Sequence, residues 1–268
     1  MAPVDFDKTP FKLQYGDASG FKEVELAELK KGFKKLPYYG PLGDDALMFR
    51  APVNGKTSPN SKYPRSELRE LKADGDEAEW SSSNGAHQMT VTLAFTWLPK
   101  DTPNLVGTQI HDSKNDTTVF RLEGKKLYIT NGNDSHYKLV TDNYKLGTKF
   151  EAKYLVYKDK VAVYYNGVLM TTISAKFTGG YFKIGAYTQA NCENSKPCSD
   201  SNYGEVAIYS CTITHTDLPL TPVPAPPNPG PLPPLPLDRM TLVVELVRDG
   251  TGWRVSGTPI VLPNGANI

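Results

Sequence analysis

The two-residue period of a β-strand is clearest in the stretch YPRSELRE, residues 63–70, where charged side chains alternate with small or apolar ones. On such a strand Arg65, Glu67 and Arg69 share one face, while Ser66 and Leu68 share the other. The guanidinium groups of two arginines form a row of hydrogen-bond donors that suit a carboxylate ligand, and the glutamate between them holds them in place. Taken alone, this pattern is more often a solvated sheet face with cross-strand ion pairs. As part of a larger site, it suits an anionic ligand.

Two later segments repeat the alternation. In GTQIH, residues 107–111, Gln109 and His111 share a face and Ile110 points the other way. The segment YFKIGAYTQ, residues 181–189, puts these residues on one face: Tyr181, Lys183, Gly185, Tyr187 and Gln189. If the three strands pair in one sheet, they line a cleft with Arg, Gln, His, Lys and Tyr side chains.

The remainder of residues 1–216 reads as a succession of short strands. Asn166-Gly167 lies between two apolar strand patterns and is the strongest local signal for a tight hairpin. Residues 86–97 alternate as another strand, and only residues 24–31 favour a helical turn, which ends at Gly32. Many antiparallel strands without intervening helices predict an all-β sandwich or jelly roll.

Composition excludes several classes of function. A formal net charge of +1 over 268 residues argues against a general polyanion binder, so we expect no nucleic-acid partner. No apolar run approaches the roughly 20 residues that a membrane span requires, so we expect no membrane partner. Residues 1–5 lack the features of a secretory signal, and the chain is interpreted as a processed, secreted protein with an added initiator Met.

The cysteines leave two disulfide pairings open. Cys192 and Cys198 are close in a polar stretch where a small disulfide loop suits an oxidising compartment, and Cys192 with Cys211 is the competing pairing. If unpaired, Cys211 is expected to be a buried free thiol in a strand. His87, His136 and His215 are too scattered in the sequence to suggest zinc ligands, so we expect no metal.

The chain changes character after His215. Ten of the eighteen residues from 219 to 236 are proline, which predicts an extended linker over residues 217–238. Residues 239–268 contain a strand pattern and a turn at Asp249-Gly250, but about thirty residues are too few for an independent domain without cross-links. We therefore predict a catalytic or binding domain over residues 1–216 and a short extension of unknown role.

The order RSELR, QIH and YFKIGAYTQ resembles the three signature regions of polysaccharide lyase family 7, the alginate lyases. The flanking segments ALMFRAPV, residues 46–53, and VAIYS, residues 206–210, fit as well, so the resemblance covers residues 6–215. It implies a jelly roll of two curved antiparallel sheets with the substrate cleft on the concave sheet. It also implies a secreted monomer that acts on an acidic polysaccharide, alginate, without a cofactor.

The resemblance implies cleavage of a 4-linked uronic acid polymer by β-elimination. Arg65, Gln109 and His111 would neutralise the sugar carboxylate, which stabilises the enolate-like transition state. Tyr187 would protonate the departing oxygen, and either Tyr187 or His111 would remove the proton on carbon 5. The expected substrate-binding residues are Glu67, which orients the arginines, and Arg69, Tyr181, Lys183 and Gln189.

Three alternatives stay open at this stage. Glucuronan is the second candidate substrate. For alginate, Ile110 in the QIH motif favours guluronate-containing blocks. Endo action is expected. A non-catalytic carbohydrate-binding jelly roll is the second class, although such modules usually hold sugars with exposed aromatic side chains. A glycoside hydrolase would need two carboxylates about 5 Å apart. The acidic cluster at residues 74–79 is the only one that resembles that pair, and its glycine and adjacent acids predict a solvated turn.

Overall fold

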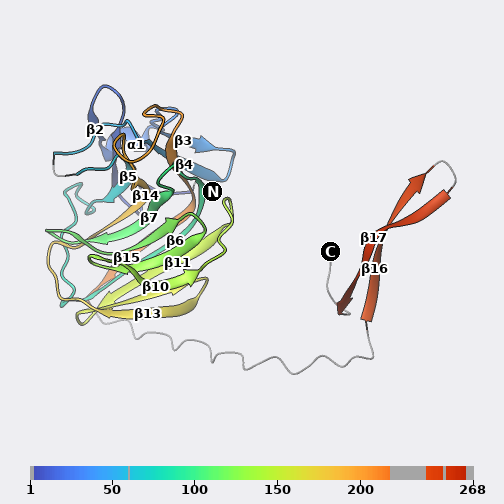
Figure 1. Cartoon of the computed structure of the whole chain (residues 1–268). Coiled ribbons are helices and arrows are strands. Elements are labelled where there is room, and N and C mark those ends of the chain that lie inside the picture. Colours follow the sequence, from blue (N-terminus) through green and yellow to red (C-terminus); the bar gives the residue numbers. More distant parts are fainter. Residues whose placement is uncertain (1–2, 60, 218–239, 250–251, 264–268) are drawn as a thin grey trace. The chain divides into compact units, whose positions relative to one another are not determined.

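The computed structural model describes residues 3–59, 61–217, 240–249 and 252–263, the last two ranges by their backbone (Figure 1). The chain divides into two compact units, Met1–Val223 and Pro224–Ile268. In the second unit β16 (Met240–Asp249) pairs antiparallel with β17 (Gly252–Pro263). The linker predicted over residues 217–238 lies almost wholly outside the described residues. The domain boundaries given above stay a prediction.

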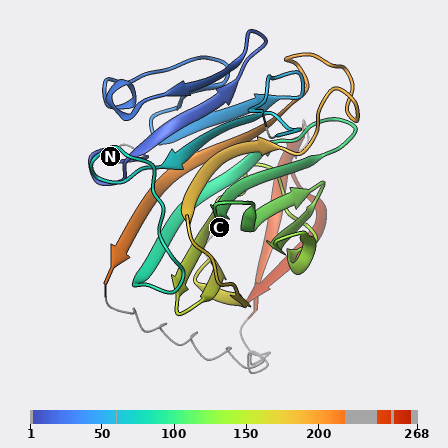
Figure 2. The same cartoon turned by 90° about the vertical axis from the view of Figure 1, so that its left-hand side faces the viewer.

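The first unit consists of two antiparallel sheets that pack against each other (Figures 1 and 2). The eight-stranded sheet runs β10 (Asp134–Thr141), β9 (Lys126–Asn131), β8 (Asp116–Glu123), β7 (Asn104–His111), β14 (Tyr181–Thr188), β5 (Arg65–Glu70), β1 (Phe11–Gly16), β2 (Phe21–Val24). The seven-stranded sheet runs β13 (Val168–Ser174), β12 (Lys160–Tyr165), β11 (Phe150–Tyr157), β6 (Ala86–Trp97), β15 (Tyr203–Thr216), β4 (Ala46–Pro52), β3 (Tyr39–Leu42). This arrangement confirms the predicted all-β jelly roll.

The core between the sheets fixes which face of each motif strand is free. Leu68, Ile110 and Ile184, from β5, β7 and β14, are fully buried and belong to one cluster with Leu93 and Phe95 of β6. Burying each such side chain contributes about 1.5–3 kcal/mol. A slip of one residue in any motif strand would put its charged side chains into this core, so the register is strongly specified.

The local turn predictions are confirmed. Asn166 and Gly167 join β12 to β13 with φ angles of 48° and 77°, the left-handed pair that a type I′ hairpin requires. The helix α1 (Leu26–Lys30) is followed by Gly32, whose φ is 81°. No helix among the described residues combines the length and the apolar character needed to cross a membrane.

Two histidines that are far apart in the sequence lie close together in the structure. The Nδ1 atoms of His87 on β6 and His215 on β15 lie 2.8 Å apart, and His215 Nε2 lies 2.7 Å from a carboxylate oxygen of Glu70. His87 Nε2 faces the carbonyl oxygens of Ser81 and Asn84 at 3.0 and 2.9 Å. The carbonyl oxygens can only accept, so His87 Nε2 carries a hydrogen, and one of the two Nδ1 atoms donates to the other. Burial and the neighbouring His215 lower the pKa of His87.

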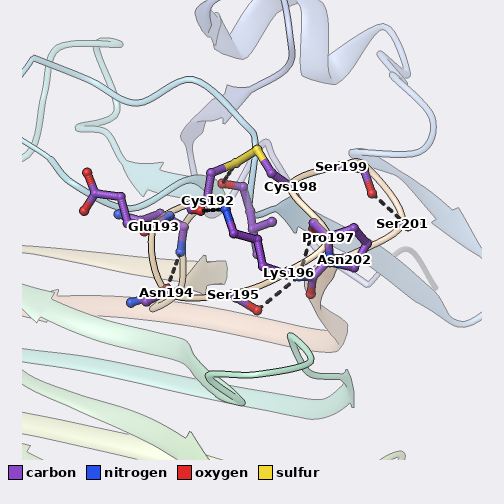
Figure 3. Close-up of a disulfide and its surroundings, with 12 residues drawn as sticks. Cys192, Glu193, Asn194, Ser195, Lys196, Pro197, Cys198, Ser199, Ser201 and Asn202 are labelled. Carbon is purple, nitrogen blue, oxygen red and sulfur yellow. Dashed lines mark hydrogen bonds between the residues drawn. A yellow bond between two sulfur atoms is a disulfide. The ribbon is translucent and has the colours of Figure 1, made fainter.

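Cys192 and Cys198 form a disulfide, as Figure 3 shows. The loop between them is held further by Asn202, whose side-chain amide donates to Ser195 Oγ at 3.0 Å and to the carbonyl oxygen of Pro197 at 3.1 Å. Cys211 is a buried free thiol, and burial raises its pKa. The disulfide prediction is confirmed, and the alternative pairing of Cys192 with Cys211 is wrong.

Candidate active site

The three motif strands are direct neighbours in the eight-stranded sheet, in the order β7, β14, β5. The register places Lys183 of β14 opposite both Gln109 of β7 and Arg69 of β5. One step along the same face, Tyr181 lies opposite His111, and Arg65 pairs with Tyr187 near the other end. Opposed side chains on one face lie about 4.5–5.5 Å apart at Cβ. The sheet therefore gathers the sequence-predicted residues on the face turned away from the core.

Glu67 is the buried centre of this face. Its carboxylate is 0% exposed and lies 2.9 Å from Lys183 Nζ and 3.3 Å from Arg65 Nη1, and it also accepts a hydrogen bond from the side-chain amide of Gln109. Burial alone would raise the pKa of Glu67, but the charges of Lys183 and Arg65 together with these hydrogen bonds hold it below its usual value. Glu67 is thus an anion that fixes three donors.

Lys183 lies deeper than the sequence analysis expected. The residue is 2% exposed, and its ammonium faces Glu67. Burial and the nearby Arg65 lower the pKa of Lys183 to about 8, because one carboxylate shared among several cations does not compensate for both effects. This placement favours a positioning role over the direct substrate contact predicted above.

Arg69 is held by a residue that the sequence analysis assigned to a solvated turn. Its Nη1 lies 2.8 Å from one carboxylate oxygen of Glu77, and the other oxygen of Glu77 lies 2.6 Å from Lys12 Nζ on β1. The Arg69 guanidinium stacks 3.9 Å over the ring of Tyr181. Glu67 was expected to orient both arginines, but its ion pair is with Arg65, and Glu77 fixes Arg69. In the acidic cluster, Glu77 is therefore part of the site.

His111 is oriented as a neutral base. Its ring stacks on Tyr181 with centroids 5.0 Å apart and an interplanar angle of 17°. His111 Nδ1 lies 2.6 Å from the carbonyl oxygen of Asp112, so Nδ1 carries the hydrogen and Nε2 keeps its lone pair. Burial and the charge of Lys183 lower the pKa of His111, which favours the neutral ring.

Tyr187 is surrounded by three groups. The guanidinium of Arg65 lies 4.2 Å over its ring, and the ring of Tyr63 meets it edge-on at 6.4 Å. The Tyr187 hydroxyl lies 3.3 Å from Ser61 Oγ, which also accepts a hydrogen bond from Arg65 Nη2 at 2.9 Å. The sequence analysis missed Ser61 and Tyr63, because loop residues before a strand have no periodic signal.

A cavity of about 170 Å³ extends the site across β7 and β8, and Gln109, Tyr187 and Gln189 line it together with Arg121 and Asp116. The Gln189 side-chain oxygen accepts from Arg121 at 3.0 Å, while its buried nitrogen has no partner among the described residues. The sequence analysis also missed Arg121, since a lone arginine in the strand TVFRLE is typical of any half-exposed sheet. Among the described residues no cluster of three His, Cys, Asp or Glu side chains could hold a metal ion.

The arrangement combines three chemical capacities on one face. Arg65 and Gln109 offer donors to a carboxylate, and the Arg65 Nε has no partner among the described residues. His111 offers a free basic nitrogen, and Tyr187 offers a phenolic hydroxyl. Charge neutralisation, a base and a proton donor are the requirements for removing a proton next to a carboxylate.

Comparisons with known proteins agree with this chemistry. A family model described as alginate lyase matches residues 4–215. The crystal structure of the alginate lyase from Corynebacterium sp. has 49% sequence identity and a TM-score of 0.77, with 80% of this chain and 96% of that chain covered. Alginate lyase AlgAT5 from polysaccharide lyase family 7 has 36% identity and a TM-score of 0.74, with the same coverages of 80% and 96%. Alginate lyase A1-II′ has 26% identity and a TM-score of 0.67, with 81% and 98% covered.

A search of curated proteins found no match. The family model spans most of the chain and both sheets, and the two more similar structures exceed 30% identity over four fifths of it. The chain therefore belongs to polysaccharide lyase family 7, the alginate lyases, and is a polysaccharide lyase.

Proposed function

We propose that this protein cleaves alginate by β-elimination, with Arg65, Gln109, His111 and Tyr187 as the catalytic residues. The observation that carries the proposal is the meeting of these four side chains, from three adjacent strands, on one face of the sheet. The matched structures are described as alginate lyases, and that of A1-II′ has been determined in a complex with product. Family membership and site chemistry thus support the same reaction.

The first step is neutralisation of the uronate carboxylate. Arg65 donates from the Nη hydrogens that are not bound to Glu67 or Ser61, and Gln109 uses the amide hydrogen that is not bound to Glu67. These donors bind more tightly as negative charge moves from carbon 5 toward the carboxylate. Glu67 holds both donors in place from beneath, so they need little reorganisation when the charge develops.

The second step moves two protons. His111 Nε2 removes the proton on carbon 5, the electrons of that bond form the double bond between carbons 4 and 5, and the bond from carbon 4 to the glycosidic oxygen breaks. The departing oxygen takes the proton of Tyr187. Where the carbon 5 proton and the departing oxygen lie on the same side of the ring, Tyr187 serves both roles. The product is an oligosaccharide with an unsaturated uronate at its non-reducing end.

The remaining predicted residues divide by depth. Tyr181, Gln189 and Arg69 border the catalytic residues and bind neighbouring sugars in this proposal, while Glu67 and Lys183 act from below. We further propose endo action with guluronate-containing blocks accepted, by a secreted monomer. The Cys192–Cys198 disulfide supports an oxidising, extracytoplasmic location.

The test is incubation of the purified protein with polymannuronate, polyguluronate and glucuronan in separate reactions. Rising ultraviolet absorbance from the conjugated double bond, with products whose masses match unsaturated uronates, is the expected result on alginate blocks. The Tyr187→Phe variant, which keeps the ring contacts, should lose nearly all turnover. Saturated products that contain added water would contradict the lyase reaction. Binding without any product would indicate a carbohydrate-binding module. Cleavage of glucuronan alone would reassign the substrate.

A further inference from the structure

We propose that Ser61 is a positioning residue for this reaction, which holds the Tyr187 hydroxyl and the Arg65 guanidinium in one fixed arrangement. This inference rests on the proposed function. Ser61 lies in the loop between β4 and β5, and its Oγ lies 2.9 Å from Arg65 Nη2 and 3.3 Å from the Tyr187 hydroxyl oxygen. A single oxygen therefore touches both the group that neutralises the carboxylate and the group that delivers the proton.

The hydrogen positions around Ser61 follow from its neighbours. Ser61 Oγ lies 3.1 Å from the carbonyl oxygen of Tyr63, which can only accept, so Ser61 donates its single hydrogen there. Arg65 can only donate, so Ser61 accepts from it. The backbone N–H of Tyr63, at 3.3 Å, also points at this oxygen. With its hydrogen on Tyr63, Ser61 Oγ has one acceptor position left beside Arg65, which the Tyr63 N–H and the Tyr187 O–H share at 3.3 Å each.

The remaining contacts make the arrangement rigid. Arg65 stacks over the Tyr187 ring at 4.2 Å, and Glu67 holds the other end of the guanidinium at 3.3 Å. Ser61 Oγ thus connects the buried anion, through Arg65, to the Tyr187 hydroxyl. Without this oxygen, Arg65 Nη2 and the Tyr187 hydroxyl lose the acceptor that they share. A displacement of about 1 Å in a proton donor can reduce a rate by up to about 10²-fold.

The expected effect falls on turnover. Ser61→Ala should lower kcat about tenfold, the equivalent of one lost hydrogen bond, and should change KM by less than about threefold. Ser61→Thr keeps the hydroxyl and should recover most of the loss. Ser58→Ala is the matched control, because it removes a hydroxyl from the same loop and keeps the Ser58 carbonyl oxygen that accepts a hydrogen bond from the Ser61 N–H. That variant should retain wild-type kcat.

Crystal structures of the wild type and Ser61→Ala provide a test that does not depend on activity. In the variant we expect the Tyr187 hydroxyl or the Arg65 guanidinium to move by about 1 Å or to lose order, with an unchanged unfolding temperature. Wild-type turnover in Ser61→Ala, or equal losses in the Ala and Thr variants, would overturn the inference while leaving the lyase intact. If the wild type makes no unsaturated uronate, the proposed function fails. Unmoved Tyr187 and Arg65 side chains would then also overturn the positioning role.

Discussion

Replacing Glu67 by Gln should reduce the stability of the folded protein by about 2–4 kcal/mol at pH 7. The substitution keeps the size of the side chain and removes only its negative charge. Glu67 is 0% exposed and contacts Lys183, Arg65 and Gln109, so water cannot replace the lost charge. Gln109 still finds an acceptor in the new amide oxygen, whereas the two cations lose their anion.

The Lys183 part of this cost has an upper limit. With a pKa of about 8, Lys183 is charged at pH 7, and releasing its proton costs about 1.4 kcal/mol. In the Glu67→Gln variant Lys183 can become neutral by releasing that proton. The part of the stability loss that comes from Lys183 therefore cannot exceed this amount. Arg65 cannot release a proton. The loss of the Glu67 charge at 3.3 Å from its guanidinium therefore costs about 1.5–3 kcal/mol more.

Urea denaturation of the wild type, Glu67→Gln, Lys183→Met and the double variant at pH 7 and pH 9 checks this reasoning. At pH 9 Lys183 is already largely neutral, so the loss caused by Glu67→Gln should shrink by about 1 kcal/mol. The double variant should be more stable than Glu67→Gln alone at pH 7. An identical loss at both pH values, or no recovery in the double variant, would refute the account of Lys183 as a buried cation that depends on Glu67.

The other predictions concern separate parts of the chain. Because the pKa of Lys183 falls from 10.5 to about 8, the unfolded chain holds a proton between these pH values that the folded chain has lost. Wild-type stability should therefore rise relative to Lys183→Met, by up to about 3 kcal/mol from pH 8 to 10.5, and a flat difference would contradict this. Cys198→Ser should cost about 2 kcal/mol, measured by thermal unfolding, because it opens a short covalent loop. A chain that ends at Thr216 should fold and keep its activity on soluble polymer, and failure to fold would show that later residues belong to the core.

The sequence predicts the faces of the motif strands because a strand has a two-residue period. Leu68, Ile110 and Ile184 had to face a core, and that requirement alone places the alternate charged and polar residues on the opposite face. The adjacency of β7, β14 and β5 was an assumption at that point, since periodicity says nothing about which strands pair. The structure supplies it, with the register Gln109 opposite Lys183.

Depth below that face could not be predicted. Lys183 and Tyr187 occupy equivalent alternating positions on β14, yet the first is 2% exposed and the second is half-buried at the surface. The difference comes from partners on other segments, because Glu67 draws the Lys183 ammonium inward while Ser61 contacts the Tyr187 hydroxyl from a loop. Contacts made by a loop depend on tertiary structure, and local alternation in a strand does not encode them. The contacts of Glu77 with Arg69 and Lys12 could not be predicted for the same reason, because its acidic cluster is typical of a solvated turn.

The charges around the motif face explain how a nearly neutral chain can attract a polyanion. The charged side chains that contact one another there are four cations and three carboxylates: Lys12, Arg65, Arg69, Lys183, Glu23, Glu67 and Glu77. Each cation has a carboxylate partner, but the seven charges sum to one excess positive charge, which a single uronate carboxylate balances. A larger excess would bind acidic polymer more tightly in the ground state and in the product, which lowers KM without raising turnover. In the function we propose, pairing the cations internally therefore reserves the attraction for the sugar at Arg65 and Gln109, where neutralising its carboxylate promotes elimination.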